Sequence, residues 1–160
     1  MAKKRVVILM GSRRDLDFTK PASALLKKMG IPVTRRVASA HKTPLKALEI
    51  LKKYDSGSEE IVFITVAGRS NALSGFTDAN TRFPVIACPP SSSAFGGADI
   101  YSSLRMPSGV APLVVLDPAG AALAAAKMLA LGDAKLAKKV AAYQRGIAAE
   151  VESSDKKLNK

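Results

Sequence analysis

The chain has 160 residues, 48% of them hydrophobic and 24% charged, which is typical of one globular domain and excludes a disordered or fibrous protein. Its formal charge is +12, and residues 1–53 hold 14 Lys and Arg against three acids, a net of +11. The single cysteine, Cys88, excludes an intramolecular disulfide, and the longest apolar run, residues 119–132, is well under the roughly 20 residues that cross a bilayer.

Short apolar runs alternate with longer helical patterns along the first half of the chain. Residues 5–10 predict a buried strand, followed by a glycine turn and a helix through 18–30. Residues 32–39 predict a second strand and 43–54 a second helix, and 60–68 form the most hydrophobic strand, expected at the centre of the sheet. Three residues mark the helix boundaries: Gly30 closes the first, while Thr43 is the N-cap and Pro44 the first turn of the second.

The second half of the chain continues the alternation and ends in two helices. Residues 83–90 predict a fourth strand, ended by two prolines that cannot continue a ladder, and 110–117 predict a fifth. The helix predicted over 118–132 is so rich in Gly and Ala that its backbone must approach a neighbour closely. A last helix runs from Asp133 to the C-terminus, with an apolar stripe made of Leu136, Val140, Tyr143, Ile147 and Val151. No strand follows this helix, so we expect it to cover a sheet face or to contact another subunit.

This order of elements predicts an α/β fold. Strands that alternate with helices form βαβ units with right-handed crossovers and a parallel sheet. Five strands in this length favour a three-layer, doubly wound, flavodoxin-like sheet with an extra C-terminal helix. We predict a single domain over residues 1–160, with a core at 1–132 and the additional helix at 133–160.

Ligands of open parallel sheets bind beyond the carboxyl ends of the strands. In this chain, the segments that leave those ends are rich in Gly, Ser and other small residues: 11–15, 39–44, 67–75, 88–93 and 117–120. In the first, Gly11 permits a tight turn, and Ser12 with free N–H groups of the next helix can hold a phosphate. Arg14 adds charge, and Asp15 either caps that helix or binds two sugar hydroxyls. The segment matches neither a Walker loop nor a dinucleotide fingerprint.

His41 is the only histidine of the chain and follows the second predicted strand. Lys42 and the adjacent helix N-terminus both disfavour an imidazolium, so we expect an uncharged His41 that accepts a proton near pH 7. One histidine and an apolar Cys88 do not make a catalytic zinc centre, and the sequence has no Gly-x-Ser-x-Gly elbow. A neutral base beside a phosphate cradle predicts proton transfer on a small phosphorylated substrate.

The basic first half indicates an anionic partner, which is either a phosphate ligand or a nucleic acid. Aromatic residues make up 5% of the chain and Trp is absent, which disfavours nucleic acid because base stacking needs aromatics. Solvated helix faces account for most of the excess charge, through Lys27, Lys28, Lys46, Lys52 and Lys53.

Five segments, taken together and in order, resemble the aminoimidazole ribonucleotide (AIR) carboxylase family of purine biosynthesis. They are LMGSRRD, SAHKTP, VAGRSNALSGF, PVIACPP and DIYSSLRMPSG, and the resemblance covers residues 5 to 132. One branch, the mutases, rearranges N5-carboxyaminoimidazole ribonucleotide and has a second histidine where this chain has Ala72, and usually arginine where it has Lys42. The chain is more similar to class II, which adds carbon dioxide directly and needs no ATP. One departure is Arg14, which stands where the family usually has serine.

The resemblance implies roles for the residues of these segments. His41 would move the proton at C4 of the substrate ring, Ser12 and Lys42 would hold the phosphate, and Asp15 would bind ribose hydroxyls. Backbone N–H groups in the third segment would stabilise the charge that develops on carbon dioxide. The full set of expected substrate-binding residues is Gly11, Ser12, Arg14, Asp15, Ser39, Lys42, Gly68, Arg69, Ser70 and Asn71. Ser39 would contact the phosphate or orient His41, and Arg69 would face the nucleotide or another subunit.

The resemblance further implies a homo-oligomer, tetramer or octamer. From the residues themselves we expect no metal, no nucleic acid and no membrane contact, and we expect no cofactor. A chain with one thiol suits the reducing cytoplasm. Three alternatives stay open at this point: a mutase, a non-catalytic module that binds nucleotide phosphates, and, least favoured, a nucleic-acid-binding protein.

Overall fold

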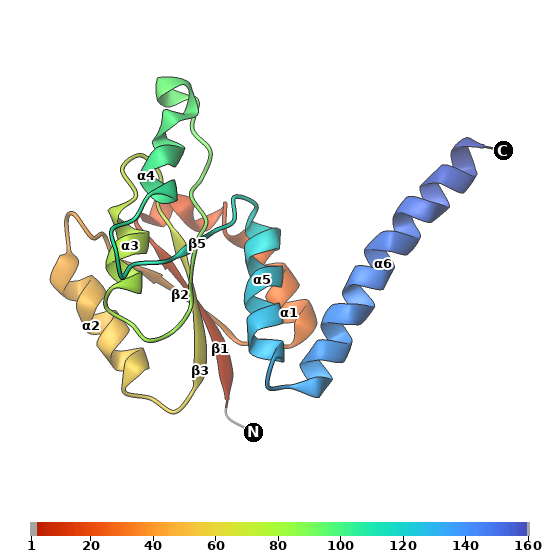
Figure 1. The fold of residues 1–160 in the computed structure, drawn as a ribbon, viewed down its shortest axis with the longest axis horizontal. Helices are drawn as coiled ribbons and strands as arrows, with labels where there is room; N and C mark the ends of the chain where they lie inside the picture. Colours follow the sequence, from red (N-terminus) through yellow and green to blue (C-terminus); the bar gives the residue numbers. More distant parts are fainter. Residues whose placement is uncertain (1–2, 160) are drawn as a thin grey trace.

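Five parallel strands form one sheet in the computed structural model, which describes residues 3–159 (Figure 1). The strands are β1 (Lys4–Met10), β2 (Val33–Val37), β3 (Glu60–Val66), β4 (Val85–Ala87) and β5 (Leu113–Val114). Their order is β2-β1-β3-β4-β5, which confirms the predicted flavodoxin-like arrangement, and β3 lies at the centre as expected.

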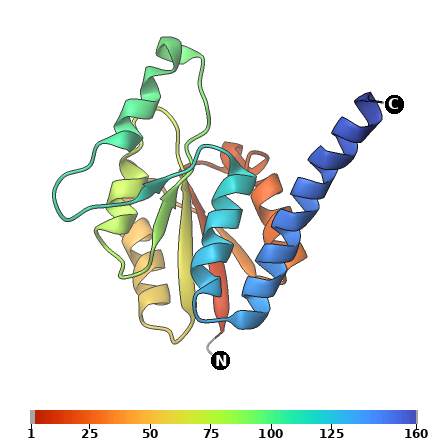
Figure 2. The same ribbon diagram turned by 45° about the vertical axis from the view of Figure 1, so that its right-hand side comes forward.

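Two layers of helices cover the two faces of the sheet. Helices α1 (Lys20–Met29), α5 (Pro118–Ala130) and α6 (Ala134–Leu158) lie on one face, and α2 (Pro44–Asp55) and α3 (Ala72–Asp78) on the other (Figures 1 and 2). Side chains of β1 alternate between these layers: Val6 and Ile8 pack with α1 and α5, whereas Val7 and Leu9 pack toward α2 and α3. Because both faces are covered, the central strands are continuous apolar runs.

The small residues of α5 allow close helix packing, as its sequence predicts. Four alanines of this helix are completely buried: Ala121, Ala122, Ala125 and Ala126. They belong to the same apolar cluster as Leu26 of α1, and the two helices run side by side. Gly30 ends α1 in the left-handed conformation, with φ of 76°, as predicted for a C-terminal glycine cap.

The predicted apolar stripe of α6 is buried over only part of the length of the helix. Leu136 and Val140 are buried against the α1–α5 layer, and Tyr143 is partly buried there. Farther along, Ile147 and Val151 are 44% and 67% exposed, and the helix extends away from the rest of the fold (Figures 1 and 2). No helix within residues 3–159 is long and apolar enough to span a membrane.

Several boundaries differ from the sequence-based expectation. Strands β4 and β5 are shorter than predicted: each begins directly after a proline, Pro84 or Pro112, which cannot donate to a ladder. Helix α1 begins at Lys20, after a separate 3₁₀ helix, η1 (Arg13–Leu16). Helix α3 and the projecting segment formed by η2 (Ala94–Ile100) and α4 (Tyr101–Leu104) were not predicted. These elements are short and lack a sustained apolar period.

Candidate active site

The loops that follow β1, β2, β3 and β4 enclose a cleft of about 550 Å³ at the carboxyl edge of the sheet. This carboxyl-edge cleft is lined by Gly11, Ser12, Arg14, Asp15, Ser39, Ala40, His41, Lys42, Ala67, Gly68, Arg69, Ser70, Leu73, Pro90, Ser91 and Ser92. The structure therefore brings together every predicted site residue except Asn71. The volume lies within the range of about 300–1,000 Å³ that is typical of small-ligand sites.

The first wall of the cleft is a loop that closes on itself. Ser12 Oγ accepts a hydrogen bond from Arg14 N–H at 3.2 Å, and Asp15 Oδ2 accepts one from Ser12 N–H at 3.0 Å, which together form a capping box. Of the helix-start N–H groups expected to bind a phosphate, that of Arg14 is therefore already paired with Ser12 Oγ. The Ser12 hydroxyl proton and the Arg14 guanidinium remain as donors on this loop. Gly11 lies close to the loop after β3, because a Cβ at this position would be 3.4 Å from Ala67 Cβ.

Asp15 combines the two roles that its sequence position left open. One oxygen of its carboxylate caps η1, and the residue also lines the cleft. Partial burial raises the pKa of the Asp15 carboxyl above its ordinary value, and the Ser12 N–H that donates to it offsets part of this shift. A carboxylate that is partly removed from water is favourable for a ligand with hydroxyl donors, because such donors replace the lost hydration.

The second wall carries His41 on a turn whose ends are tied together. Thr43 Oγ1 accepts a hydrogen bond from Ser39 N–H at 2.9 Å, and Ser39 Oγ accepts one from Lys42 N–H at 3.2 Å. Thr43 is the N-cap residue of α2, as predicted, but its hydroxyl caps no helix N–H and instead holds this turn. Ser39 thus shapes the turn that presents His41, and neither of these contacts involves the imidazole.

The third wall is the loop after β3, in which Arg69 adopts a left-handed conformation with φ of 58°. Asn71, at the end of this loop, is only 3% exposed and does not line the cleft. Its N–H donates to Ser102 Oγ at 3.0 Å, and its side chain accepts a hydrogen bond from Ser74 N–H. The structure therefore places Asn71, unlike the other predicted site residues, outside the cleft, and its N–H is paired within the fold. Its role as the N-cap of α3 is structural.

Sequence reasoning identified the segment after β4 as part of the site edge but assigned no residue in it. Pro90, Ser91 and Ser92 supply the fourth wall of the cleft. The consecutive prolines and serines were the available signal, since Pro89 cannot continue the ladder beyond Cys88 and the serine hydroxyls follow at the carboxyl edge. Apolar contacts come from Ala40, Ala67 and Leu73, whose small or buried side chains carried no chemical signal in the sequence.

Charge in the cleft favours an anionic ligand. Three cations line it, Arg14, Lys42 and Arg69, against the single carboxylate of Asp15. Guanidinium and ammonium groups form charge-assisted hydrogen bonds with phosphate. The cleft therefore offers cations for a phosphate, a carboxylate for hydroxyls and one imidazole for proton transfer.

Cys88 lies near this edge but takes no part in it. Its side chain is fully buried, and burial raises the pKa of the thiol to about 12, with a smaller contribution from the carboxylate of Asp117. Such a thiol stays protonated and is a poor nucleophile. Within the described residues, no three His, Cys, Asp or Glu side chains gather closely enough to hold a metal ion.

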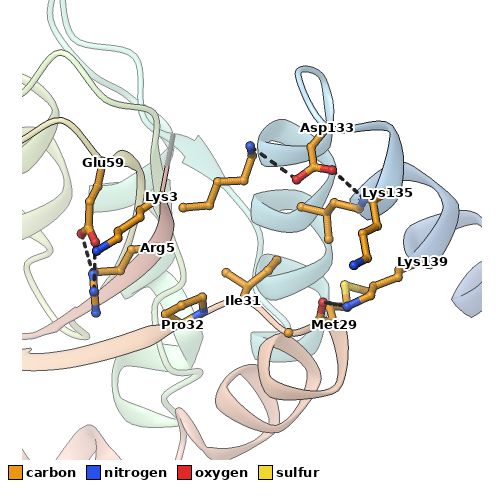
Figure 3. Close-up of a pocket in the computed structure, with 12 residues that line it drawn as sticks. Lys3, Arg5, Met29, Ile31, Pro32, Glu59, Asp133, Lys135 and Lys139 are labelled. Atoms are coloured by element: carbon orange, nitrogen blue, oxygen red, sulfur yellow. Dashed lines mark hydrogen bonds and ion pairs between the residues drawn. The ribbon is translucent and has the colours of Figure 1, made fainter. Parts of the chain in front are cut away.

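A second hollow, of about 370 Å³, lies at the amino edge of the sheet, between the start of β1 and the start of α6 (Figure 3). It concentrates cations, and three of them, Lys4, Arg5 and Lys139, have partners within the fold. The Arg5 guanidinium forms two hydrogen bonds with Glu59, and Lys139 Nζ donates to the carbonyl of Met29 at 2.8 Å. The lysines on helix faces are exposed, as expected: Lys27, Lys28, Lys46, Lys52 and Lys53. None of the predicted site residues lines this hollow, so we assign the active site to the carboxyl-edge cleft.

Known proteins share this sequence and this fold. The sequence profile of the AIR carboxylase family matches residues 5–150. A phosphoribosylaminoimidazole carboxylase of Archaeoglobus fulgidus is 55% identical over 154 residues, which are 96% of this chain and 84% of the relative. Another, of Treponema denticola, is 46% identical over 155 residues, 97% of this chain and 98% of the relative. The crystal structure of Treponema denticola PurE superposes with a TM-score of 0.95 at 45% identity, over 98% of this chain and 99% of that chain.

Proposed function

The chain belongs to the AIR carboxylase family, and from that premise we propose that it joins carbon dioxide to 5-aminoimidazole ribonucleotide, reversibly and without ATP. The product is 4-carboxy-5-aminoimidazole ribonucleotide. The family match and the named relatives identify the chain as an enzyme of purine biosynthesis of the AIR carboxylase type. The choice of carbon dioxide as co-substrate and the roles of single residues form the proposal.

The observation that carries the proposal is the position of the only imidazole. His41 lines the same cleft as Ser12, Asp15 and Lys42, which come from two different loops. Ser12 and Lys42, helped by Arg14, are assigned to the phosphate, and Asp15 is assigned to the ribose hydroxyls. A ribonucleotide held in this way has its base in the same cleft as His41.

The chemistry requires one proton transfer at one carbon. The aminoimidazole ring is an enamine, so its C4 is nucleophilic and attacks carbon dioxide. The attack leaves a tetrahedral C4 that carries both its proton and the new carboxylate. The imidazole of His41 takes this proton as a general base, and the C–H electron pair returns to the ring and restores aromaticity. In the reverse direction His41 protonates C4, and carbon dioxide leaves.

Carbon dioxide binds weakly, so the enzyme must mainly position it and stabilise the negative charge that develops on its oxygens. We assign this stabilisation to backbone N–H groups of Gly68 and Ser70, in the loop that forms the third wall of the cleft. Arg69 lines the same wall and adds positive charge near the expected position of carbon dioxide.

The decisive experiment is carboxylation in the absence of ATP. The purified chain, given 5-aminoimidazole ribonucleotide and bicarbonate, should form the carboxylated product at a rate that increases with dissolved carbon dioxide. The absence of the second histidine, with Ala72 in its place, motivates this expectation. Turnover of the N5-carboxylated compound alone would assign the chain to the mutase branch. Tight binding of the ribonucleotide without turnover of either compound would support a non-catalytic binding module instead.

We propose further that copies of this chain assemble through the distal half of α6 into a tetramer or an octamer. Ile147 and Val151 are large apolar side chains that the fold leaves exposed on this helix. Closed homo-oligomers are common, and apolar patches of this kind mark their interfaces. Sedimentation equilibrium should give four or eight times the chain mass, and Val151→Asp should shift it downward. A monomer at micromolar concentration would contradict this assembly.

A further inference from the structure

Ser102 lies outside the carboxyl-edge cleft, on α4, yet its hydroxyl contacts two backbone groups of the loop that forms the third wall. Asn71 N–H donates to Ser102 Oγ at 3.0 Å. The same hydroxyl lies 3.0 Å from the carbonyl oxygen of Arg69 and 2.7 Å from that of Asp99, so its one proton is shared between two acceptors. A single side chain from the projecting segment thus bridges residues 69 and 71.

The bridged loop has a backbone conformation that needs support. Arg69, at φ of 58°, is the only residue other than glycine with positive φ in the part of the chain that the structure describes. A residue with a Cβ disfavours this region and stays there only when its surroundings fix it. Ser102 binds the carbonyl of Arg69 itself and the N–H two residues later, which are the groups that define the turn.

The neighbouring serine anchors the end of the loop. Asn71 Nδ2 donates to Ser103 Oγ at 2.9 Å and to Ser74 Oγ at 2.7 Å, and Ser74 Oγ lies 2.8 Å from Thr65 Oγ1 of β3. All of these side chains are buried. These buried hydrogen bonds fix the position of Asn71 relative to β3. The conformation of the loop before Asn71 therefore depends on the exposed contact with Ser102.

We propose that Ser102 is a positioning residue for the carbon dioxide side of the reaction. It holds the left-handed turn at Arg69, and thereby keeps the backbone of Gly68 and Ser70 in the geometry that receives the developing carboxylate. The phosphate and ribose contacts lie on other loops, which Ser102 does not touch. This inference rests on the proposed function, since it deepens the role given there to the third wall.

The test compares three variants with the wild-type enzyme. Ser102→Ala removes the hydroxyl, Ser102→Thr keeps it, and Ser93→Ala is the matched control, an exposed serine of the same segment whose side chain caps no N–H. Ser102 is exposed and alanine favours helices, so the Ala variant should fold with an unchanged unfolding midpoint. Loss of the hydrogen bonds that the Ser102 hydroxyl makes with Asn71 N–H and the Arg69 carbonyl should raise the KM for carbon dioxide by about tenfold.

The other readouts separate positioning from general damage. Calorimetric affinity for the ribonucleotide, measured without bicarbonate, should stay within about twofold in all variants, because the loops that bind it are intact. Ser102→Thr and Ser93→Ala should keep the wild-type KM for carbon dioxide. Failure of the wild type to carboxylate would overturn the proposed function before any variant is compared. With an active wild type, an unchanged carbon dioxide KM in Ser102→Ala, or an equal loss in ribonucleotide affinity, would overturn the role of Ser102.

Discussion

His41→Asn should abolish most of the carboxylation and of the reverse decarboxylation, each falling on the order of a thousandfold, while the ribonucleotide still binds. His41 is the only imidazole of the chain and lines the cleft, so no other group of this kind can take the C4 proton. Asparagine has a similar shape and keeps a polar side chain, but it does not accept a proton near pH 7. Steady-state rates in both directions measure the effect.

The fold of this variant should be unaffected, because the turn that carries His41 is held by other groups. Ser39 and Thr43 close it through their hydroxyls and backbone, and the imidazole is exposed. The unfolding midpoint and the calorimetric affinity for the ribonucleotide serve as controls. Activity within a few-fold of the wild type, with binding intact, would exclude His41 as the base and would leave the proposed mechanism without its central step.

The sheet and the place of the site could be predicted because both depend on short-range patterns. Residues 6–10 of β1 form an uninterrupted apolar run, and the glycine and serine that follow the strand mark the carboxyl edge. Parallel topology then brings the ends of consecutive strands to one edge, so the residues of the loops converge without any knowledge of their contacts. Ten of the eleven predicted site residues line one cleft for this reason.

Local hydrogen bonds account for what the sequence did not reveal. The Ser12 hydroxyl accepts from the Arg14 N–H, one of the groups expected to bind phosphate, and Asn71 points into a buried network rather than the cleft. The partners of Asn71 lie up to 32 residues away, on α4, which itself had no recognisable helical period. Side chains that satisfy one another over such separations leave no periodic signal in the chain.

Helix α6 illustrates a different limit. Its apolar stripe predicts one buried face along its whole length, yet only its first part has a partner in this chain. A hydrophobic stripe indicates that a face is covered, but it does not say whether the same chain or another copy covers it. In the proposed assembly, the same chain buries the first part of the stripe and another copy buries the rest.

Lys42→Ala should raise the KM for the ribonucleotide by roughly 10- to 100-fold and change kcat much less, because a charge-assisted hydrogen bond to phosphate is worth about 1.5–3 kcal/mol. The phosphate is remote from the reacting carbon, so its contact is made equally in the ground state and the transition state. The turn should persist, since the bond to Ser39 comes from the backbone N–H of Lys42 and not from its ammonium group.

Two comparisons make the effect of Lys42 specific. Lys46→Ala removes the same charge from an exposed position on α2 that does not line the cleft, and it should leave the KM within about twofold. Lys42→Arg retains a cation and should recover most of the affinity. Because Lys42 is exposed, added salt should weaken ribonucleotide binding in the wild type more than in Lys42→Ala. Equal KM values for Lys42→Ala and Lys46→Ala would instead mean that the phosphate is held by Ser12 and Arg14 alone.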